Sequence, residues 1–448
     1  MGSSQSSPLA NVHVVVVGGS LASKSIITEL DKLGARITLV APQDRLYVAF
    51  GGVRAACKEG YEDTLLLPYT KLFKGNAASL HLRALATGVD AAGRSLRVQP
   101  VDAHGQVDAS QPARELAYDF LILATGLHAP APWRAPPSVP HFKHQLGAMR
   151  AALRGASSVC VVGGGMVGVE FVGEIKHAFP ALAVHLVTTG AALLEHDPVH
   201  PMLRDLLLAE CKRLGIQVTL GARAEGLAEL GVKAGVAQLA PGAYASTAAG
   251  TPIALGLVPS GRAGAPPPPP TLAADVVFSA VSSGKPATAW LAGSPAVPLD
   301  AAGYIAVEPT YQVRGLSNVF ALGDAAAAAG DIKDAFTTKG QAAIIAHNIR
   351  ALVAEAAAAA AAAAGKSSAP KPAALKRGPA ARPPVFIVPV GPSGGYAQVP
   401  GILRPNFLSF IARFKAGKFI ADMMGKEMGL TEAEVKAANE GIAAAPAG

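Results

Sequence analysis

SVCVVGGGMVGVEFVGEIKHAFP, residues 158–180, joins a short β-branched run to a glycine cluster and then to a helical pattern. The glycines have the spacing Gly163-x-Gly165-x-x-Gly168, and a second apolar run, VHLV at 184–187, follows. This order predicts a βαβ unit. In such a unit the first glycine makes the turn, the second admits a pyrophosphate, and the third lets helix and strand pack closely. We therefore expect a dinucleotide site, the alternative being a glycine-rich turn without a ligand.

The same plan opens the chain. VHVVVV at 12–17 is followed by Gly18 and Gly19, a helical pattern, and RITLV at 36–40. Two βαβ units predict an α/β fold with two Rossmann-like dinucleotide-binding domains. Further buried strands are predicted at FLILATG (120–126), which ends in a small-residue turn, and at DVVFSAV (275–281). NVFALGDAAAA (318–328) is predicted to be a strand that runs into a Gly-Asp turn and a helix.

The two predicted nucleotide sites differ at the positions where residues that bind the ribose are expected. In the first, Ser20 and Ser23 occupy the second and third glycine positions, and Ala41 stands where a ribose-binding acid is expected. In the second, Thr188 and Thr189 occupy the acid position. An acid there would accept hydrogen bonds from ribose hydroxyls. Loss of the nucleotide from the first site is thus one outcome that the sequence leaves open, and at the second site NADH cannot be chosen over NADPH.

Composition excludes several classes of protein. The 448 residues are 50% hydrophobic and 16% charged, too apolar for a disordered chain. The net charge of +8 permits an anionic partner, but the basic residues are dispersed, so no specific nucleic-acid binding is expected. Three separated cysteines form neither a disulfide framework nor a metal site, and the histidines lack metal spacing. We expect no metal.

The order of the motifs adds a resemblance. A nucleotide fold, ATG at 124–126, a second nucleotide fold and FALGD at 320–324 resemble the two-dinucleotide flavoprotein reductases. Within these, the chain resembles the apoptosis-inducing-factor-like, ferroptosis-suppressor group, which is related to type II NADH dehydrogenases. GGGMVGVEFVGEIKHAFP (163–180), SNVFALGDAA (317–326) and VGPSGGYAQVPG (390–401) carry the likeness, which covers nearly the whole chain.

The resemblance implies FAD and NAD(P)H as cofactors and assigns residues to each. Asp324 would hydrogen-bond a ribityl hydroxyl, and the backbone of Ala86 would touch the adenine. The residues expected to bind FAD are Gly18, Gly19, Ser20, Arg54, Ala86, Thr125, Gly126, Gly323 and Asp324. Those expected to bind NAD(P)H are Gly163, Gly165 and Gly168.

Two charged residues are the catalytic candidates. Glu170 follows the glycines, near where nicotinamide would meet flavin, and Lys333 follows the Gly-Asp turn. A buried Lys–Glu pair could orient the reacting rings and supply protons. The alternative is an ordinary ion pair or two solvated charges.

The cysteines limit the electron acceptor. Disulfide reductases of this architecture need two neighbouring cysteines, and Cys57 has no partner near it in the sequence. Electrons must then leave the flavin for another acceptor, such as a quinone or oxygen. We expect an FAD-dependent NAD(P)H:quinone oxidoreductase. The alternative is a flavin-deficient NAD(P)H-binding sensor or scaffold.

Features near both ends of the chain predict that the protein binds a membrane surface. Gly2 after Met1, with Ser6, fits an N-myristoylation signal, although a polar, frayed tail reads the same way. A basic, apolar segment at 402–426 would be the second anchor that stable binding requires. Its aromatic residues could instead cover the reductase core or a second subunit, giving a homodimer. No uninterrupted apolar run reaches the length of a membrane span, so we expect a cytoplasmic protein held peripherally on a membrane.

The expected plan divides the chain into six parts. These are a flexible tail at 1–10, a first FAD-binding segment at 11–140, an NAD(P)H-binding domain at 141–288, a second FAD-binding segment at 289–355, a low-complexity linker at 356–382 and a small α+β C-terminal region at 383–448.

Overall fold

The computed structural model describes residues 7–128, 137–227, 244–246, 252–264, 267–281, 284–328, 333, 335–366, 368, 371–379, 384–401, 419–440 and 442. The chain forms two compact units, each assembled from separate stretches. The first comprises Met1–Tyr47, Leu67–His128 and Gly284–Arg382, and the second comprises Val48–Leu66, Ala129–Ser283 and Pro383–Gly448.

The first unit is built on a five-stranded parallel sheet with the strand order β19-β9-β1-β2-β5. The valines of β1 are buried on both faces, as in other parallel sheets that helices cover. α1 turns its apolar stripe inward through Ala22, Ile26, Ile27 and Leu30. The sheet elements are β1 (His13–Val17), α1 (Leu21–Lys32), β2 (Arg36–Val40), β5 (Leu80–Leu82), β9 (Phe120–Leu123) and β19 (Val319–Ala321).

Smaller elements complete this unit. An antiparallel three-stranded sheet, order β6-β7-β8, shares an apolar core with β1, β9 and β19. Its strands are β6 (Ala84–Asp90), β7 (Ser95–Pro100) and β8 (Arg114–Ala117). The others are β3 (Arg45–Tyr47), η3 (Tyr69–Leu72), η4 (Ala289–Leu291), β18 (Ile305–Ala306), η5 (Gly323–Ala325), β20 (Ala326–Ala327) and α7 (Ala335–Ala363), while β4 (Leu66–Pro68) lies at the sequence boundary between the units.

The second unit repeats the plan with the strand order β12-β11-β10-β17-β14. All pairs are parallel except β14 with β17. The sheet elements are β10 (Ser158–Val162), α4 (Met166–Ala178), β11 (Ala183–Val187), α5 (Pro201–Arg213), β12 (Gln217–Thr219), β14 (Tyr244–Ser246) and β17 (Val276–Ser279). The α/β class with two Rossmann-like sheets is thus confirmed.

Other elements surround the second sheet. An antiparallel sheet contains β13 (Ala222–Ala224), β15 (Ile253–Pro259) and β16 (Thr271–Ala274). A hairpin of β21 (Phe386–Val390) and β22 (Gly394–Gln398) lies on α4, which approaches it closely at Gly173. The remaining elements are η1 (Ala49–Gly51), α2 (Gly52–Ala55), η2 (Tyr61–Thr64), α3 (Val139–Gly155), α9 (Phe419–Glu427) and α10 (Glu432–Glu440).

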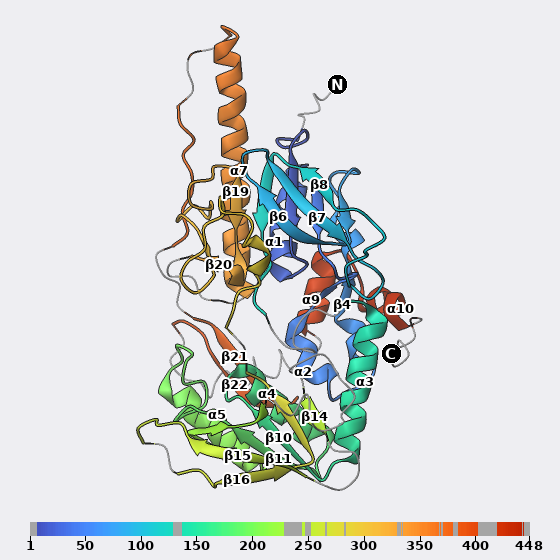
Figure 1. Cartoon of the computed structure of the whole chain (residues 1–448), viewed down its shortest axis with the longest axis vertical. Coiled ribbons are helices and arrows are strands. Elements are labelled where there is room, and N and C mark those ends of the chain that lie inside the picture. The colour runs from blue at the N-terminus through green and yellow to red at the C-terminus, as the bar shows by residue number, and fades with distance from the viewer. Residues whose placement is uncertain are drawn as a thin grey trace. The chain divides into compact units, whose positions relative to one another are not determined.

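Helix α7 includes most of the alanine run, which the sequence allows as an extension of a helix over 340–355. It begins at Ala335 and continues through the alanine run to Ala363, and its distal end projects beyond the other elements of its unit (Figure 1). Its segment Thr337–Ala363 is long and apolar enough to cross a membrane by length and composition alone, with a mean hydropathy of 1.3. The proximal half buries Ala342, Ile345 and Ile349 and packs against α1, as a core helix does.

Candidate nucleotide-binding sites

Three loops of the first unit meet at one edge of its sheet. They follow β1, β9 and β19, which are neighbours, and they carry Gly18, Thr125 and Gly323. The methyl group of Ala22, in the first turn of α1, lies 3.0 Å from where a side chain at Gly323 would begin. Ligands of open parallel sheets bind outside the carboxyl ends of the strands. The predicted FAD residues of this unit therefore gather where a dinucleotide would bind.

The turn after β1 requires glycine at position 18. Gly18 has φ +109°, and a side chain there would overlap the backbone of Ala124. Ser23, at the third position of the degraded fingerprint, is buried, and its hydroxyl donates a hydrogen bond to the carbonyl of Gly18. The serine thus holds the turn instead of disrupting it.

Tyr69 lies beside the glycine turn of this site, and no local sequence motif marks it. Its hydroxyl donates to the carbonyl of Gly19 at 2.7 Å, and any side chain at position 19 would overlap that hydroxyl. The Cβ of Ala41 lies 2.9 Å from where a side chain at Gly19 would begin. The His81 ring contacts the Tyr69 ring at a tilt of 52°, with ring centroids 4.5 Å apart, and its Nε2 lies 3.1 Å from the Ala41 carbonyl. A tyrosine and a histidine thus line the place where an acid is usual.

The turn after β9 carries an unsatisfied donor. The buried hydroxyl oxygen of Thr125 has no hydrogen-bond partner among the described residues. The backbone N–H of Gly323 donates to Gln341 at 2.7 Å, and Asp324 lies in the first turn of η5. A buried orphan hydroxyl beside a glycine turn fits a polar ligand, because such groups are rarely left unpaired.

Ala86 and Arg54 lie in different units. Ala86 pairs with Val98 in the antiparallel sheet, beside a β-bulge between Ala86 and Gly88. Arg54, on α2 of the second unit, donates through Nε and Nη2 to the carboxylate of Glu174 at 2.6–3.2 Å. Both of those side chains are largely buried, at 11% and 7% exposure. The FAD contact predicted for Arg54 stays a prediction.

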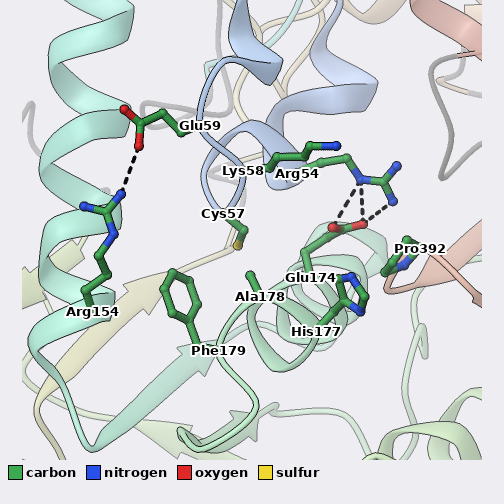
Figure 2. A pocket seen from close by; sticks show the side chains of 10 residues that line it. All are labelled: Arg54, Cys57, Lys58, Glu59, Arg154, Glu174, His177, Ala178, Phe179 and Pro392. Carbon is green, nitrogen blue, oxygen red and sulfur yellow. Dashed lines mark hydrogen bonds and ion pairs between the residues drawn. The ribbon is translucent and has the colours of Figure 1, made fainter.

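Arg54 also lines a cavity of about 510 Å³ within the second unit. Figure 2 shows the Arg54–Glu174 pair on one side, the Arg154–Glu59 pair on the other, and the Cys57 thiol between them. The remaining lining residues are Lys58, His177, Ala178, Phe179 and Pro392. No sequence motif indicated this cavity, because its walls come from stretches far apart in the chain.

The glycine loop of the second unit has the predicted form. Gly163 has φ +126°, and a side chain there would overlap the backbone of Ala280. A Cβ at Gly168 would overlap the Gly163 carbonyl, whereas the space beside Gly165 is open. Gly165 is also the N-cap of α4, so a bound diphosphate could approach the backbone and the positive end of the helix dipole.

The two catalytic candidates have different surroundings. Glu170 is buried on α4 with 6% exposure. Lys333 is exposed, so the expectation of a buried lysine is wrong. Its ammonium group donates to the carbonyls of Asp324 and Ala326 at 3.0 and 2.7 Å, and it lies 4.2 Å from the centre of the Tyr304 ring. Since the two residues belong to separate units, their pairing stays a prediction.

All three cysteines, Cys57, Cys160 and Cys211, are free and buried. Burial raises the pKa of the Cys57 thiol, and it raises the pKa values of Cys160 and Cys211 to about 12. Thiols with such pKa values are poor nucleophiles near neutral pH. The predicted lipidation site Gly2 and residues 402–418 of the basic segment lie outside the described residues.

Both glycine turns lie within a region of the chain that matches a known protein family. The family model of pyridine nucleotide-disulphide oxidoreductases matches residues 12–360. The chain belongs to this family. It is an NAD(P)H-dependent flavoprotein oxidoreductase with FAD and NAD(P)H as cofactors. Human ferroptosis suppressor protein 1 is 26% identical over 336 residues, covering 73% of this chain and 77% of that protein. Apoptosis-inducing factor homolog B of Dictyostelium discoideum is 24% identical over 355 residues, covering 76% and 81%.

Solved structures of other oxidoreductases share the fold. A ferredoxin reductase from Rhodopseudomonas palustris superposes with a TM-score of 0.54 at 19% identity, covering 76% of each chain. Reduced CoADR-RHD of Bacillus anthracis gives 0.56 at 16% identity, covering 76% of this chain and 57% of that one. These likenesses support the two-dinucleotide-domain architecture that the motif order predicted.

Proposed function

We propose that this oxidoreductase passes the electrons of NAD(P)H to a lipid-soluble quinone at a membrane surface. The overall reaction converts NAD(P)H, one proton and a quinone into NAD(P)⁺ and a quinol. The observation that carries the proposal is the state of the cysteines. Three buried, separate thiols with raised pKa values do not form the dithiol that a disulfide reductase needs. The likeness to ferroptosis suppressor protein 1 also supports a quinone as the electron acceptor.

The chain's own residues would bind and orient the reactants. Bound FAD supplies the redox chemistry, because flavin can accept a hydride and return two electrons. In the first unit, the Gly18 turn would admit the diphosphate, and Thr125 and Asp324 would hydrogen-bond the ligand. In the second unit, the Gly165 N-cap would hold the diphosphate of the nicotinamide nucleotide. Glu170 follows that loop and would orient the nicotinamide.

Lys333 has a positioning role in this proposal. Its ammonium group holds two carbonyls of the Gly-Asp turn, one of them that of Asp324. Fixing this backbone would keep the Asp324 carboxylate near the flavin side of the site. Lys333 would therefore act on the ligand indirectly, by holding the turn that carries Asp324.

The ends of the chain would provide membrane contact. One myristoyl group on Gly2 binds membranes only weakly, so a second signal is required. We assign that signal to the basic, apolar segment 402–426, and we expect the protein to be cytoplasmic and peripheral. Protein produced together with a myristoyltransferase and carrying both Gly2→Ala and a truncation before Leu403 should no longer sediment with lipid vesicles, while each single change should reduce binding. Undiminished sedimentation of the doubly altered protein would contradict the anchoring model.

The competing hypothesis of a flavin-deficient sensor depended on Ser23 and Ala41. Ser23 holds the Gly18 carbonyl, and Tyr69 lies beside Ala41, so neither substitution leaves the loop unsupported. These contacts favour the oxidoreductase over the sensor.

The acceptor is tested with the FAD-loaded protein. NADH oxidation is followed with a benzoquinone in lipid vesicles, with oxygen, and with a low-molecular-weight disulfide. We expect the quinone to support at least about ten-fold faster turnover than the disulfide. We also expect Cys57→Ala to retain the quinone rate, because no thiol takes part. Equal or faster disulfide reduction, lost in Cys57→Ala, would overturn the proposal.

A further inference from the structure

The nicotinamide site lacks an acid at the end of β11, where one usually binds the adenosine ribose. Thr188 stands there and is buried. Its side chain lies against Gly164, with Cβ 2.6 Å from where a side chain at Gly164 would begin. The threonine therefore packs on the glycine loop. The charge that recognises the ribose must come from elsewhere.

The chain after β11 folds back toward the glycine loop. The N–H of Leu194 donates to the carbonyl of Gly164 at 2.9 Å, and Leu194 has φ +52°, a conformation that non-glycine residues adopt only when held. Arg204 of α5 donates to the carbonyls of Glu195 and Asp197 at 3.2 and 3.0 Å. These bonds fix residues 190–197 beside the fingerprint.

This fold-back brings the carboxylate of Glu195 against Gly190 and Ala191, in the turn that follows β11. Its Oε2 accepts the N–H of Ala191 at 2.9 Å and lies 2.6 Å from where a side chain at Gly190 would begin. The side chain is 25% exposed. Among the described residues, every contact of this carboxylate is made through Oε2, so Oε1 is available to a ligand.

One cation lies beside this carboxylate. Arg262 follows β15 in the sequence, and its Nε is 3.9 Å from Glu195 Oε2, with 47% of its side chain exposed. The distance is longer than a hydrogen bond, so the pair is loose. An arginine in this position would bind a phosphate group if the carboxylate were absent.

We infer that Glu195 is the ribose-recognising acid of the nicotinamide site and makes the protein selective for NADH over NADPH. The inference rests on the proposed use of the second unit as the nicotinamide site. Glu195 would accept hydrogen bonds from the ribose hydroxyls of NADH. The same carboxylate repels the 2′-phosphate of NADPH and offsets the attraction of the nearby Arg262 for that phosphate.

The test measures binding apart from turnover. ADP-ribose and 2′-phospho-ADP-ribose are titrated into the FAD-loaded protein by calorimetry, and Kd is compared among wild type, Glu195→Gln and Asp205→Asn. Gln can still accept the Ala191 N–H, so the turn should persist. Asp205 is an exposed carboxylate on α5 of the same unit and serves as the charge-matched control. A double variant, Glu195→Gln with Arg262→Gln, tests the arginine.

We expect wild type to bind ADP-ribose at least about ten-fold more tightly than its 2′-phosphate, as a charge-assisted hydrogen bond allows. Glu195→Gln should weaken ADP-ribose binding and strengthen binding of the 2′-phosphate, and Arg262→Gln should remove that gain. Asp205→Asn should behave as wild type. An unchanged Kd ratio in Glu195→Gln, or a wild-type preference for the 2′-phosphate, would overturn the inference while leaving the proposed function intact. If wild type bound neither ligand, the nicotinamide site itself would be refuted.

Discussion

Gly165 is the residue through which the nucleotide site can be tested most simply. The space beside it is open, whereas side chains at Gly163 and Gly168 would overlap backbone. Gly165→Val should therefore fold, yet fill the space that a diphosphate would use. We expect its Kd for NADH to rise at least about ten-fold with FAD content unchanged. The control is Gly147→Val on α3, where the added side chain also meets open space. Equal NADH affinity in both variants would refute the site.

Tyr69 is the residue of the flavin site that sequence analysis missed. Tyr69→Phe removes the donor to the half-buried Gly19 carbonyl and should cost about 1–3 kcal/mol of folding free energy. FAD should dissociate more readily, because the loop that carries it loses a support. Thermal unfolding and the release of flavin fluorescence measure both effects.

Tyr118→Phe provides the matched control for that experiment. The buried Tyr118 hydroxyl has no hydrogen-bond partner among the described residues, so its removal should cost little. Similar flavin release from the two variants would show that Tyr69 has no special role.

At the scale of elements, a buried ion pair joins η2 to α3 in the second unit. Arg150 donates to Glu62 at 2.8 Å and to the Ala55 carbonyl at 2.7 Å, and both charged side chains are 5% exposed. Arg150→Met should destabilise the protein by about 3–5 kcal/mol, because Glu62 keeps a buried, uncompensated charge. Adding Glu62→Leu should restore much of the loss.

The next turn of α3 supplies the comparison. Arg154 pairs with Glu59 at 3.2 Å, but these side chains are 58% and 76% exposed. Arg154→Met should therefore change stability by about 1 kcal/mol or less. Denaturant unfolding compares the variants, and equal losses at positions 150 and 154 would contradict the assigned importance of burial.

The sequence predicted regular elements better than it predicted side-chain contacts. β1, α1, β10 and α4 follow from apolar periodicity and glycine spacing, which are local signals. Tyr69 reaches Gly19 across 50 positions, so no local motif marks it. No motif marks Glu195, because the fingerprint expects an acid at the strand end, whereas the chain folds back and brings this later acid to the turn after β11.

At the scale of the whole molecule, partly buried histidines predict a loss of stability in acid. Burial lowers the pKa values of His13, His81 and His185 from 6.5, with further lowering by Arg36 at His13 and by Arg83 at His81. Below pH 6.5 the unfolded chain therefore binds more protons than the folded chain. The stability that these neutral histidines allow is fully present above pH 6.5, and the free energy of unfolding declines as the pH falls below that value.

Chemical denaturation between pH 8 and pH 5 measures that dependence. His81→Gln should flatten the decline between pH 6.5 and 5, because glutamine does not titrate. The exposed His104 is the control position, and His104→Gln should leave the pH profile unchanged. A profile of His81→Gln that matches wild type would exclude His81 as a contributor.

We expect NADH to reduce bound FAD and a quinone to remove the electrons. The visible absorption spectrum of the purified, FAD-loaded protein tests it directly, recorded without air before NADH, after NADH, and after a benzoquinone is added. NADH should bleach the flavin bands and the quinone should restore them, at rates that a disulfide does not match. Flavin bands that NADH leaves unchanged, or that only a disulfide restores, would contradict it.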